Sequence, residues 1–289
     1  MKPYPRRRSL RFAAVEPRQL KDRIDAFPRW HYRFEFEGGV RTPVAYEGQA
    51  NRHSERRRYF FDPLLGLLGG SLAGRRVLDL GCNAGWWSLQ AVEAGADFVL
   101  GVDARAECVE QAELVFEAKS VPASSYRFAT ANVFDGPGFA LDGEGPFDVA
   151  LCLGLLDVTA RPLELFELMG GLGAELIVLD TGISRMRPAV FEVSTLSEPA
   201  NAVDRRLTLL PSRRAVAELA RELGYECVAL AHEMLDYTGL EDYRRGQRLA
   251  FVCARKTGLG TLRPAPEQTA LPWRAASLDP RGLLARLRG

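Results

Sequence analysis

The sequence has no long apolar run and no excess of charge of either sign. Its apolar stretches, such as residues 149–156, are far shorter than the ~20 residues that a membrane-spanning helix needs. Lysine and arginine number 38 and aspartate and glutamate 37, so a net charge of +1 provides no global field for a polyanion. The basic start is not followed by the apolar segment of a secretory signal. These absences argue against a membrane role and leave nucleic-acid binding dependent on a local basic patch.

Cysteine is also scarce and has no motif spacing. The five cysteines form no C-x-x-C pair and have no histidine at ligand spacing, which argues against both a zinc site and a disulfide framework. We therefore expect no metal and a reduced, cytoplasmic setting. Cys152 and Cys253 lie in apolar runs, where a small buried side chain is the simplest interpretation.

The sequence does contain enough apolar residues for a full core, since 47% of its 289 residues are hydrophobic. From residue 75 to 171, short β-prone runs alternate with helical stretches, a pattern typical of an α/β protein with a parallel sheet covered by helices. Two later strands follow one another without a helix between them, so this pair should be antiparallel at one side of the sheet. The expected strands are 76–80, 98–102, 126–129, 147–153, 176–179, 227–230 and 249–254, and the expected helices are 86–94, 106–119, 162–169 and 211–223.

Two regions flank this α/β pattern. The N-terminal one has an amphipathic stretch at 19–27, an aromatic run at 30–36 and a helix from about Ser54, and we interpret it as a cap. The C-terminal one is rich in proline, leucine and arginine and should end in a short helix at 281–287. The expected regions are therefore an N-terminal cap at 1–70, the α/β domain at 71–256 and a tail at 257–289.

The first expected strand runs directly into the glycine-rich sequence DLGCNAGWW, where a helix begins. Glycines allow a tight turn and a close approach to a ligand, and the free amides of the helix N-terminus point to the same place. The loop lacks the G-x-G-x-x-G pattern of dinucleotide sites, because Asn83 and Ser88 hold the second and third glycine positions. Asp79 would repel a diphosphate but attract an ammonium and a sulfonium group, which predicts S-adenosylmethionine as the ligand. The alternative is a structural turn in which Asp79 only caps local amides.

The next two strands end in further polar residues that suit this ligand. Asp103 lies 18 residues after Gly85 and can accept hydrogen bonds from both ribose hydroxyls. Asn132 offers an acceptor to the adenine amino group, and the Val133 amide can serve a ring nitrogen. Taken singly, Asp103 could be a turn acid and Asn132 a loop former. The expected cofactor-binding residues are Asp79, Gly81, Cys82, Asn83, Gly85, Trp86, Asp103, Ala104, Asn132, Val133 and Leu153.

In their order and spacing these residues resemble the class I S-adenosylmethionine-dependent methyltransferases, over roughly residues 75–256. The resemblance implies a Rossmann-like sheet with strand order 3-2-1-4-5-7-6 and an antiparallel last strand. Segments 77–85, 154–156, 210–212 and 247–256 are similar to the branch that contains the wobble-uridine tRNA carboxymethyltransferases and many small-molecule enzymes.

One position departs from those tRNA enzymes. Where they have Tyr-His after Gly-x-Leu, with the Tyr helping to hold the extra carboxylate of carboxy-S-adenosylmethionine, this chain has Asp157-Val158. Arg248 does match the family's carboxylate-binding arginine. An ionised Asp157 would repel a second carboxylate, so we expect ordinary S-adenosylmethionine as the cofactor.

Methyl transfer needs an aligned nucleophile and often a proton acceptor, and the acceptor should lie at the carboxyl ends of the strands. Asp157 after the fourth strand is a candidate base, and the alternative is that it merely caps the helix that follows. His53, in a polar segment of the cap, is the second candidate, although such a histidine is more often a surface residue. A long arginine-containing segment at 182–206 is either a lid over the acceptor or a solvated loop. The expected substrate-binding residues are His31, Asp180, Arg205 and Arg248.

The sequence therefore predicts a methyltransferase that acts on a small molecule, most readily on oxygen. It lacks the Asn/Asp-Pro-Pro-aromatic motif that the family's nucleobase amino-methylating enzymes carry after strand four. The basic runs 6–8 and 56–58 keep nucleic acid open as a partner, but acids interrupt them and we interpret them as solvated faces. A tRNA wobble-uridine enzyme and a non-catalytic adenosylmethionine-binding protein are the alternatives. The sequence does not predict an oligomeric state.

Overall fold

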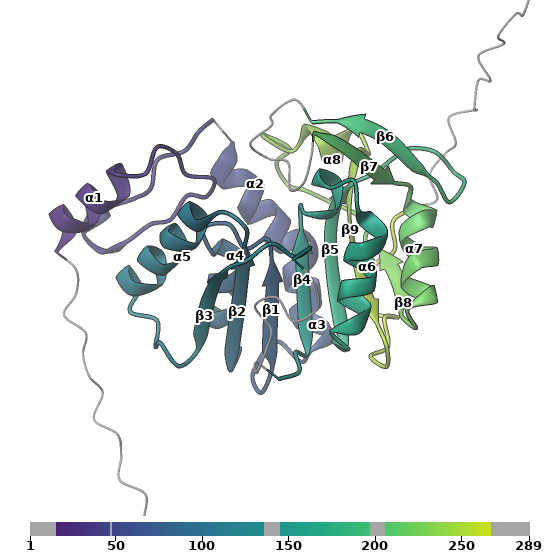
Figure 1. Cartoon of the computed structure of the whole chain (residues 1–289), viewed down its shortest axis with the longest axis horizontal. Coiled ribbons are helices and arrows are strands. Elements are labelled where there is room, and N and C mark those ends of the chain that lie inside the picture. Colours follow the sequence, from purple (N-terminus) through teal and green to yellow (C-terminus); the bar gives the residue numbers. More distant parts are fainter. Residues whose placement is uncertain (1–15, 47, 136–144, 197–205, 267–289) are drawn as a thin grey trace, which may run out of the picture.

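The computed structural model describes residues 16–46, 48–135, 145–196 and 206–266. Within these ranges a seven-stranded sheet is covered by helices on both faces (Figure 1). The strands of this sheet are β1 (Arg76–Leu80), β2 (Phe98–Asp103), β3 (Tyr126–Thr130), β4 (Val149–Leu153), β5 (Leu176–Gly182), β8 (Glu226–Ala229) and β9 (Arg248–Ala254). The α-helices are α1 (Pro17–Asp25), α2 (Gln49–Arg56), α3 (Asp62–Leu67), α4 (Trp86–Glu93), α5 (Ala106–Ala118), α6 (Pro162–Gly171), α7 (Arg213–Glu222) and α8 (Glu241–Arg244).

The strand order confirms the predicted Rossmann-like α/β topology. It is β3-β2-β1-β4-β5-β9-β8, which equals 3-2-1-4-5-7-6 once β6 and β7, which lie outside this sheet, are left out of the numbering. The first five strands pair in parallel, whereas β9 runs antiparallel to both β5 and β8. The carboxyl ends of the five parallel strands therefore meet at one edge, where such folds bind ligands.

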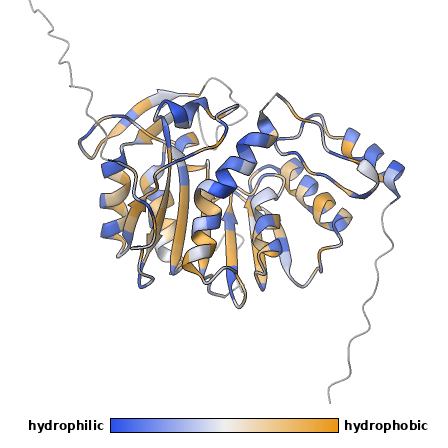
Figure 2. Cartoon of the chain, turned by 180° about the vertical axis from the view of Figure 1, so that it is seen from behind, coloured by the Kyte–Doolittle hydropathy of each residue, from blue (hydrophilic) through white to orange (hydrophobic). Residues whose placement is uncertain are grey.

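Alternate residues of the strands enter two hydrophobic layers, as the period of two in a strand requires. Val77 and Val99 pack with residues of α4 and α5 on one face, whereas Leu78 and Leu100 pack with residues of α6 and α7 on the other. Figure 2 shows the apolar colour along the strands and on the helix sides that face them. Burial on both faces explains why these strands are nearly continuous apolar runs.

The cap differs from the prediction in the position of its helix. We expected a helix from about Ser54, but α2 begins at Gln49 and continues through a π-helical turn (η2, Arg57–Phe61) into α3. The side chain of Gln49 is buried and bonds the Ala45 amide at 2.6 Å and the Trp30 carbonyl at 3.3 Å. This glutamine holds the aromatic segment against the start of α2, so the helix begins earlier in the sequence than the polar composition of this segment suggested.

A second difference is a two-stranded antiparallel sheet where we expected a lid or a solvated loop. Here β6 (Phe191–Thr195) pairs with β7 (Leu207–Pro211). The following helix, α7, begins at Arg213 rather than at Pro211, because Pro211 still pairs with Phe191 and the Ser212 hydroxyl accepts the Ala215 amide as the helix cap. The expected helix at 281–287 lies outside the described residues.

Candidate functional site

A cleft of about 790 Å³ lies between the cap and the loops that follow β1, β2, β3 and β4. Small-molecule sites usually measure about 300–1,000 Å³. Cap residues such as His31, Tyr32 and Arg52 form one wall. Seven of the predicted cofactor-binding residues line the cleft, namely Gly81, Asn83, Asp103, Ala104, Asn132, Val133 and Leu153.

The glycine loop takes the left-handed backbone that its sequence indicated. Gly81, Asn83 and Gly85 have φ values of +73°, +52° and +75°. A Cβ atom on Gly85 would lie 3.0 Å from the Phe128 ring and 3.1 Å from Ala112, so this glycine is needed for packing. The amides of Gly81 and Cys82 bond the Val102 carbonyl at 2.8 and 3.0 Å, which holds the loop against the end of β2.

Four predicted cofactor-binding residues are not among the described residues that line the cleft: Asp79, Cys82, Gly85 and Trp86. Cys82 is 1% exposed, and its burial raises the pKa of the thiol well above its usual value. Trp86 stacks on Tyr32 with ring centroids 6.0 Å apart and so ties α4 to the cap. Cys82, Gly85 and Trp86 therefore shape the cleft from behind.

Asp79 is buried beneath the loop rather than open to it. Only 1% of the residue is exposed, and Oδ2 accepts a hydrogen bond from the Ser88 hydroxyl at 2.7 Å. Burial, together with the charge of Asp103, raises the pKa of Asp79 to about 7. The carboxyl is therefore only partly ionised at neutral pH, which revises the expectation of a full negative charge below the loop.

Binding of a ligand with an ammonium group near Asp79 is expected to release a proton. A nearby cation favours the ionised carboxylate, and its pKa of about 7 places the release near neutral pH. Calorimetry of adenosylhomocysteine binding in two buffers of different ionisation enthalpy measures this proton. For the wild type near pH 7, the binding heats measured in the two buffers are expected to differ. For Asp79→Asn they should be equal. Equal binding heats in the two buffers for the wild type at pH 6 to 7.5 would contradict a role for Asp79.

The same pKa has a consequence for stability. Because the pKa of Asp79 in the folded chain lies above the 3.8 of an unperturbed aspartate, the folded state holds the proton more tightly. The contribution of this carboxyl to stability is therefore fully present below about pH 4 and is lost as the pH rises through about 7.

Asp103 lies at the end of β2 with its carboxylate directed at the loop and at Arg105. Oδ2 accepts the Asn83 amide at 2.9 Å, and Oδ1 accepts the backbone amide and Nε of Arg105 at 3.0 and 2.9 Å. The Arg105 side chain is 42% exposed, so it can move away and leave the Asp103 carboxylate free to accept hydrogen bonds from another donor. The arrangement fits a ribose whose two hydroxyls replace the guanidinium.

Asn132 has a structural role beside its predicted one. Its side-chain oxygen accepts the Phe134 amide at 3.0 Å, as expected for a residue that forms a loop. Asn132 and Val133 nevertheless both line the cleft after β3. Both residues predicted to meet the adenine edge therefore lie at the cleft, although part of the acceptor capacity of Asn132 is already used.

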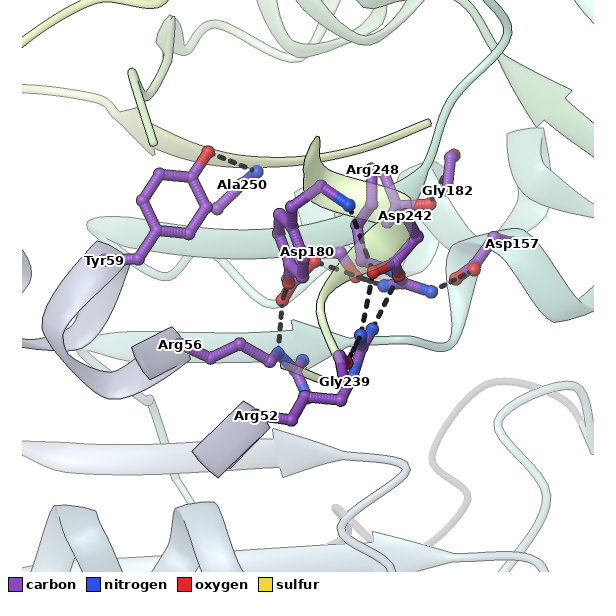
Figure 3. A network of polar contacts seen from close by, with 12 residues as sticks. Arg52, Arg56, Tyr59, Asp157, Asp180, Gly182, Gly239, Asp242, Arg248 and Ala250 are labelled. Carbon is purple, nitrogen blue, oxygen red and sulfur yellow. Dashed lines mark hydrogen bonds and ion pairs between the residues drawn. The ribbon is translucent and has the colours of Figure 1, made fainter. Parts of the chain in front are cut away.

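A buried network of arginines and aspartates joins the cap to the other side of the cleft (Figure 3). Asp180 on β5 is 0% exposed and accepts Arg56 Nε at 2.7 Å, Arg248 Nη1 at 3.1 Å and the Tyr243 hydroxyl. Burial alone would raise the pKa of Asp180, but the charges of both arginines and the hydrogen bond from Tyr243 hold it below its usual value. Asp180 is therefore a charged residue that anchors α2 to the sheet.

Arg248 at the start of β9 is enclosed by carboxylates. It forms ion pairs with Asp157 and Asp180 and, through Nε at 3.1 Å, with Asp242. Asp242 also binds both terminal nitrogens of Arg52 at 2.8 and 2.7 Å. The formal charges of the network cancel, because three arginines face three aspartates, and Arg248 carries no unbalanced charge toward the cleft.

The two predicted catalytic residues lie behind the wall of the cleft rather than in the part of it that the structure describes. Asp157 binds Arg248 through Oδ2, and its buried Oδ1 has no hydrogen-bond partner in the described ranges. His53 lies inside α2 and is 2% exposed, with both ring nitrogens also lacking a partner there. Burial and the charge of Arg56 lower the pKa of His53 well below its usual value.

Of the predicted substrate-binding residues, His31 and Arg248 line the cleft, and Asp180 lies in the network behind it. The His31 ring lies 5.5 Å from that of His53, and burial followed by the charge of Arg56 lowers the pKa of His31 to about 4. Both imidazoles are therefore neutral at pH 7. Arg205 lies outside the described residues.

Sequence reasoning missed Arg52, Arg56, Asp242 and Tyr243 as members of this site. The sequence signal was a pair of charge clusters at 52–58 and 241–245, and we interpreted the arginine run 56–58 within the first as a solvated face. In the described ranges, no group of three or more histidine, cysteine or acidic side chains is arranged to hold a metal ion. None of the helices in those ranges is both long and apolar enough to cross a bilayer.

Comparison with known proteins identifies the class. A family model described as a methyltransferase domain matches residues 52–230, which is more than half of the chain. The chain therefore belongs to this methyltransferase family. The matched part is an S-adenosylmethionine-dependent methyltransferase domain, which confirms the class and the cofactor predicted from the sequence.

Two curated relatives have the same name, tRNA U34 carboxymethyltransferase. The protein from Geobacter sp. (strain M21) is 34% identical over 123 residues, which is 42% of this chain and 36% of the relative. The protein from Citrifermentans bemidjiense is 29% identical over 161 residues, or 55% of this chain and 47% of the relative. The chain thus spans less than half the length of these relatives.

Solved structures share the fold at low sequence identity. The N-terminal domain of EvdMO1 has a TM-score of 0.61 at 21% identity and covers 83% of this chain and 96% of its own. The magnesium protoporphyrin IX methyltransferase of Synechocystis PCC 6803 has a TM-score of 0.50 at 15% identity, covering 74% of this chain and 89% of its own. These likenesses support the fold.

Proposed function

We propose that the chain transfers the methyl group of S-adenosylmethionine to a hydroxyl group of a small molecule. The observation that carries this proposal is the enclosure of Arg248 by Asp157, Asp180 and Asp242. This enclosure removes the free arginine that a carboxylated cofactor would need. It favours plain S-adenosylmethionine over the carboxylated cofactor of the tRNA enzymes that the sequence resembles.

We assign the ribose and the adenine of the cofactor to residues of the cleft. Asp103 would hold the ribose hydroxyls, the turn at Asn132 and Val133 would hold the adenine edge, and Gly81 would allow close approach of the backbone. When bound, the cofactor supplies a methyl group on a positively charged sulfur. The protein then has to align the acceptor oxygen with that methyl group and exclude water.

Plain S-adenosylmethionine is expected to bind at least about tenfold more tightly than carboxy-S-adenosylmethionine, because Asp157 places a like charge beside the extra carboxylate. Calorimetry with both ligands measures the ratio. Asp157→Ala should reduce this ratio of affinities, because it frees one side of Arg248. Asp62 forms a surface ion pair with Arg57, and Asp62→Ala should leave the ratio unchanged. Tighter binding of the carboxylated ligand by the wild type would overturn this part of the proposal.

A polynucleotide acceptor is disfavoured by the state of the arginine run at 56–58. Arg56 is buried against Asp180, Arg57 forms an ion pair with Asp62, and Arg58 forms one with Glu55. Arginines whose charge is already balanced release few counterions on meeting a phosphate backbone. The run therefore provides little of the affinity that a tRNA-binding surface needs, and the other basic run, 6–8, lies outside the described residues.

The cleft suits a neutral, hydroxylated acceptor. Its cap wall presents the neutral His31 ring beside Tyr32 and Gln49, while the charges of Arg52 and Arg56 are balanced internally. One fold neighbour, the N-terminal domain of EvdMO1, was crystallised in the presence of adenosylhomocysteine and D-fucose, a polyhydroxylated molecule. As part of the proposal, we take a hydroxylated molecule of this chemical class as the acceptor of this chain.

We assign the contact with the acceptor hydroxyl to His31 and a positioning role to His53 behind it. A neutral imidazole can accept the hydroxyl proton, although burial and the nearby Arg56 oppose the imidazolium form. His31→Ala is expected to slow single-turnover methylation about tenfold or more. His53→Phe, which keeps a ring in the same packing, should change the rate less than about threefold, because a positioning ring need not exchange protons. Unchanged rates in both variants would contradict the assignment. Catalysis would then come only from aligning the acceptor oxygen with the methyl group.

The proposed function is tested with methyl-labelled S-adenosylmethionine and two sets of acceptors, hydroxylated small molecules and bulk tRNA. Labelled product is expected only with small molecules, and mass spectrometry should place the methyl group on oxygen. The tRNA reaction is the second candidate, favoured by the 34% identity to a tRNA U34 enzyme. Methylation of tRNA, with binding that weakens steeply as salt rises, would replace the first proposal.

A further inference from the structure

Cys227 and Cys253 lie directly opposite each other at one edge of the sheet. They are register partners on the antiparallel strands β8 and β9, and their sulfur atoms are 2.7 Å apart. The two cysteines are 26 positions apart in the sequence, so the absence of motif spacing concealed this pairing. The contact brings together two thiols at a distance from the cleft residues described above.

The strand geometry at this pair is compatible with a disulfide bond. In the same ladder the Leu230 amide donates to the Ala250 carbonyl at 2.9 Å, which identifies that pair as hydrogen-bonded. Because the two kinds of pair alternate, Cys227 and Cys253, three positions further along, form a non-hydrogen-bonded pair. Such pairs have Cα atoms about 4.5 Å apart, and disulfides span Cα separations of about 4.4–6.8 Å.

The two thiols differ in how accessible they are to a reagent from solution, and this difference would determine which of them reacts first. Cys253 is 1% exposed, and burial together with the contact to Cys227 raises its pKa well above its usual value. Cys227 is half-buried and so is the sulfur that a reagent from solution can reach. A reagent would therefore meet Cys227 first, and Cys253 would act second.

We propose that Cys227 and Cys253 form a reversible disulfide bond that responds to thiol redox conditions. With a small-molecule disulfide as oxidant, the Cys227 thiolate attacks one sulfur, forms a mixed disulfide and releases the first thiol. The Cys253 thiolate then attacks the Cys227 sulfur, and the second thiol leaves. The two cysteines lose two electrons and two protons, and the small disulfide gains both as it becomes two thiols.

The bond would enclose the segment that supplies three members of the buried network. Asp242, Tyr243 and Arg248 all lie between the two cysteines in the sequence. A disulfide that closes a loop of this size restricts the unfolded chain. Oxidation should therefore raise the melting temperature by about 5 °C or more and hold this segment against the sheet.

The experiment is peptide mapping of the full-length wild-type chain after equilibration with glutathione disulfide. The chain is then denatured in the presence of N-ethylmaleimide so that buried free thiols are also blocked, and the digest is analysed by mass spectrometry with and without prior reduction. A Cys227–Cys253 crosslink is expected, with the maleimide on Cys82, Cys108 and Cys152, and reduction should make all five cysteines reactive. Absence of the crosslink, a different crosslink, or glutathione that stays on Cys227 would each overturn the proposal.

Matched variants separate the bond from other effects of oxidation. Cys227→Ser is expected to lose both the crosslink and the rise in melting temperature, whereas Cys108→Ser, a cysteine on α5, should retain both. A rise in melting temperature that persists in Cys227→Ser would contradict the proposal. The wild-type mapping stands on its own if a variant does not fold.

Discussion

Replacing Asp180 by alanine is expected to lower the free energy of unfolding by about 3–5 kcal/mol, which is the largest effect of any single change considered for this chain. The substitution removes the partner of Arg56, whose side chain is only 5% exposed, and also unpairs Arg248 and the Tyr243 hydroxyl. A buried guanidinium without a counter-charge has lost its hydration without compensation. Urea denaturation measures the change.

Two comparisons test the cause of this loss. Asp62→Ala breaks an exposed ion pair whose partners are 42% and 47% exposed, and it should cost less than about 0.5 kcal/mol. The double variant Arg56→Met with Asp180→Leu should be more stable than Asp180→Ala, because it leaves no charge unpaired at the Arg56 end of the network. If Asp180→Ala were no more harmful than Asp62→Ala, the network would not be what holds the cap to the sheet.

The charge of Asp180 also determines how the chain responds to acid. Its pKa lies below the usual 3.8 because the neighbouring arginines outweigh the opposing effect of burial. The folded state therefore binds this proton less readily than the unfolded state. The stability it contributes is present above about pH 4 and is lost as the pH falls below that value. In Asp180→Ala the free energy of unfolding should therefore depend less on pH below about pH 4.

Replacing Asp103 by alanine is expected to weaken adenosylhomocysteine binding about 30-fold to 100-fold. Hydrogen bonds to a charged group contribute about 1.5–3 kcal/mol, and tenfold in affinity corresponds to about 1.4 kcal/mol. Asp103 is 5% exposed and lines the cleft, so a ribose bound there would lose its principal acceptor. Titration calorimetry measures the dissociation constant.

Two neighbours on the same wall provide the controls. Glu107→Ala also removes a carboxylate from the cleft and should change the affinity less than about threefold, because it has no predicted ribose contact. Arg105→Ala should leave the affinity equal or tighter, because the guanidinium competes for the Asp103 carboxylate. Equal losses in the Asp103 and Glu107 variants would indicate a general charge effect and would contradict a ribose site at Asp103.

The sheet could be predicted because its information is local. Each central strand is a short apolar run, and both faces are covered, so the runs stand out from the helices between them. The predicted 76–80 agrees with β1, and the predicted antiparallel pairing of the last two strands is confirmed. The expectation that no helix lies between them was wrong, because the short helix α8 lies between β8 and β9. Asn83, Asp103 and Asn132 could be predicted to line one cleft because each lies at or just after the carboxyl end of its strand.

The buried network could not be predicted because its partners are far apart in the sequence. Arg56 and Asp180 are separated by 124 residues, and Arg248 and Asp157 by 91. A run of arginines gives no sign of which one will be buried, and a polar segment before a helix is interpreted as exposed. His53 was placed before the helix for that reason, although it lies inside α2 and is 2% exposed.

The two-stranded sheet and the cysteine pair were missed for similar reasons. The segment 182–206 is long and rich in arginine, which suggested a loop, yet Phe191 and Val193 alternate with polar residues over the five residues that form β6. Cys227 and Cys253 became neighbours only through the register of β8 with β9. In each case the missing information was strand pairing, which composition does not contain.

The central claim is that the cleft at the carboxyl ends of the strands holds a positively charged sulfur nucleoside and not a diphosphate cofactor. Titration calorimetry of the purified chain with adenosylhomocysteine, and separately with NADH, tests it directly. We expect saturable binding of adenosylhomocysteine in the micromolar range and no heat with NADH at millimolar concentration. Binding of NADH, together with no response to millimolar adenosylhomocysteine, would contradict the account.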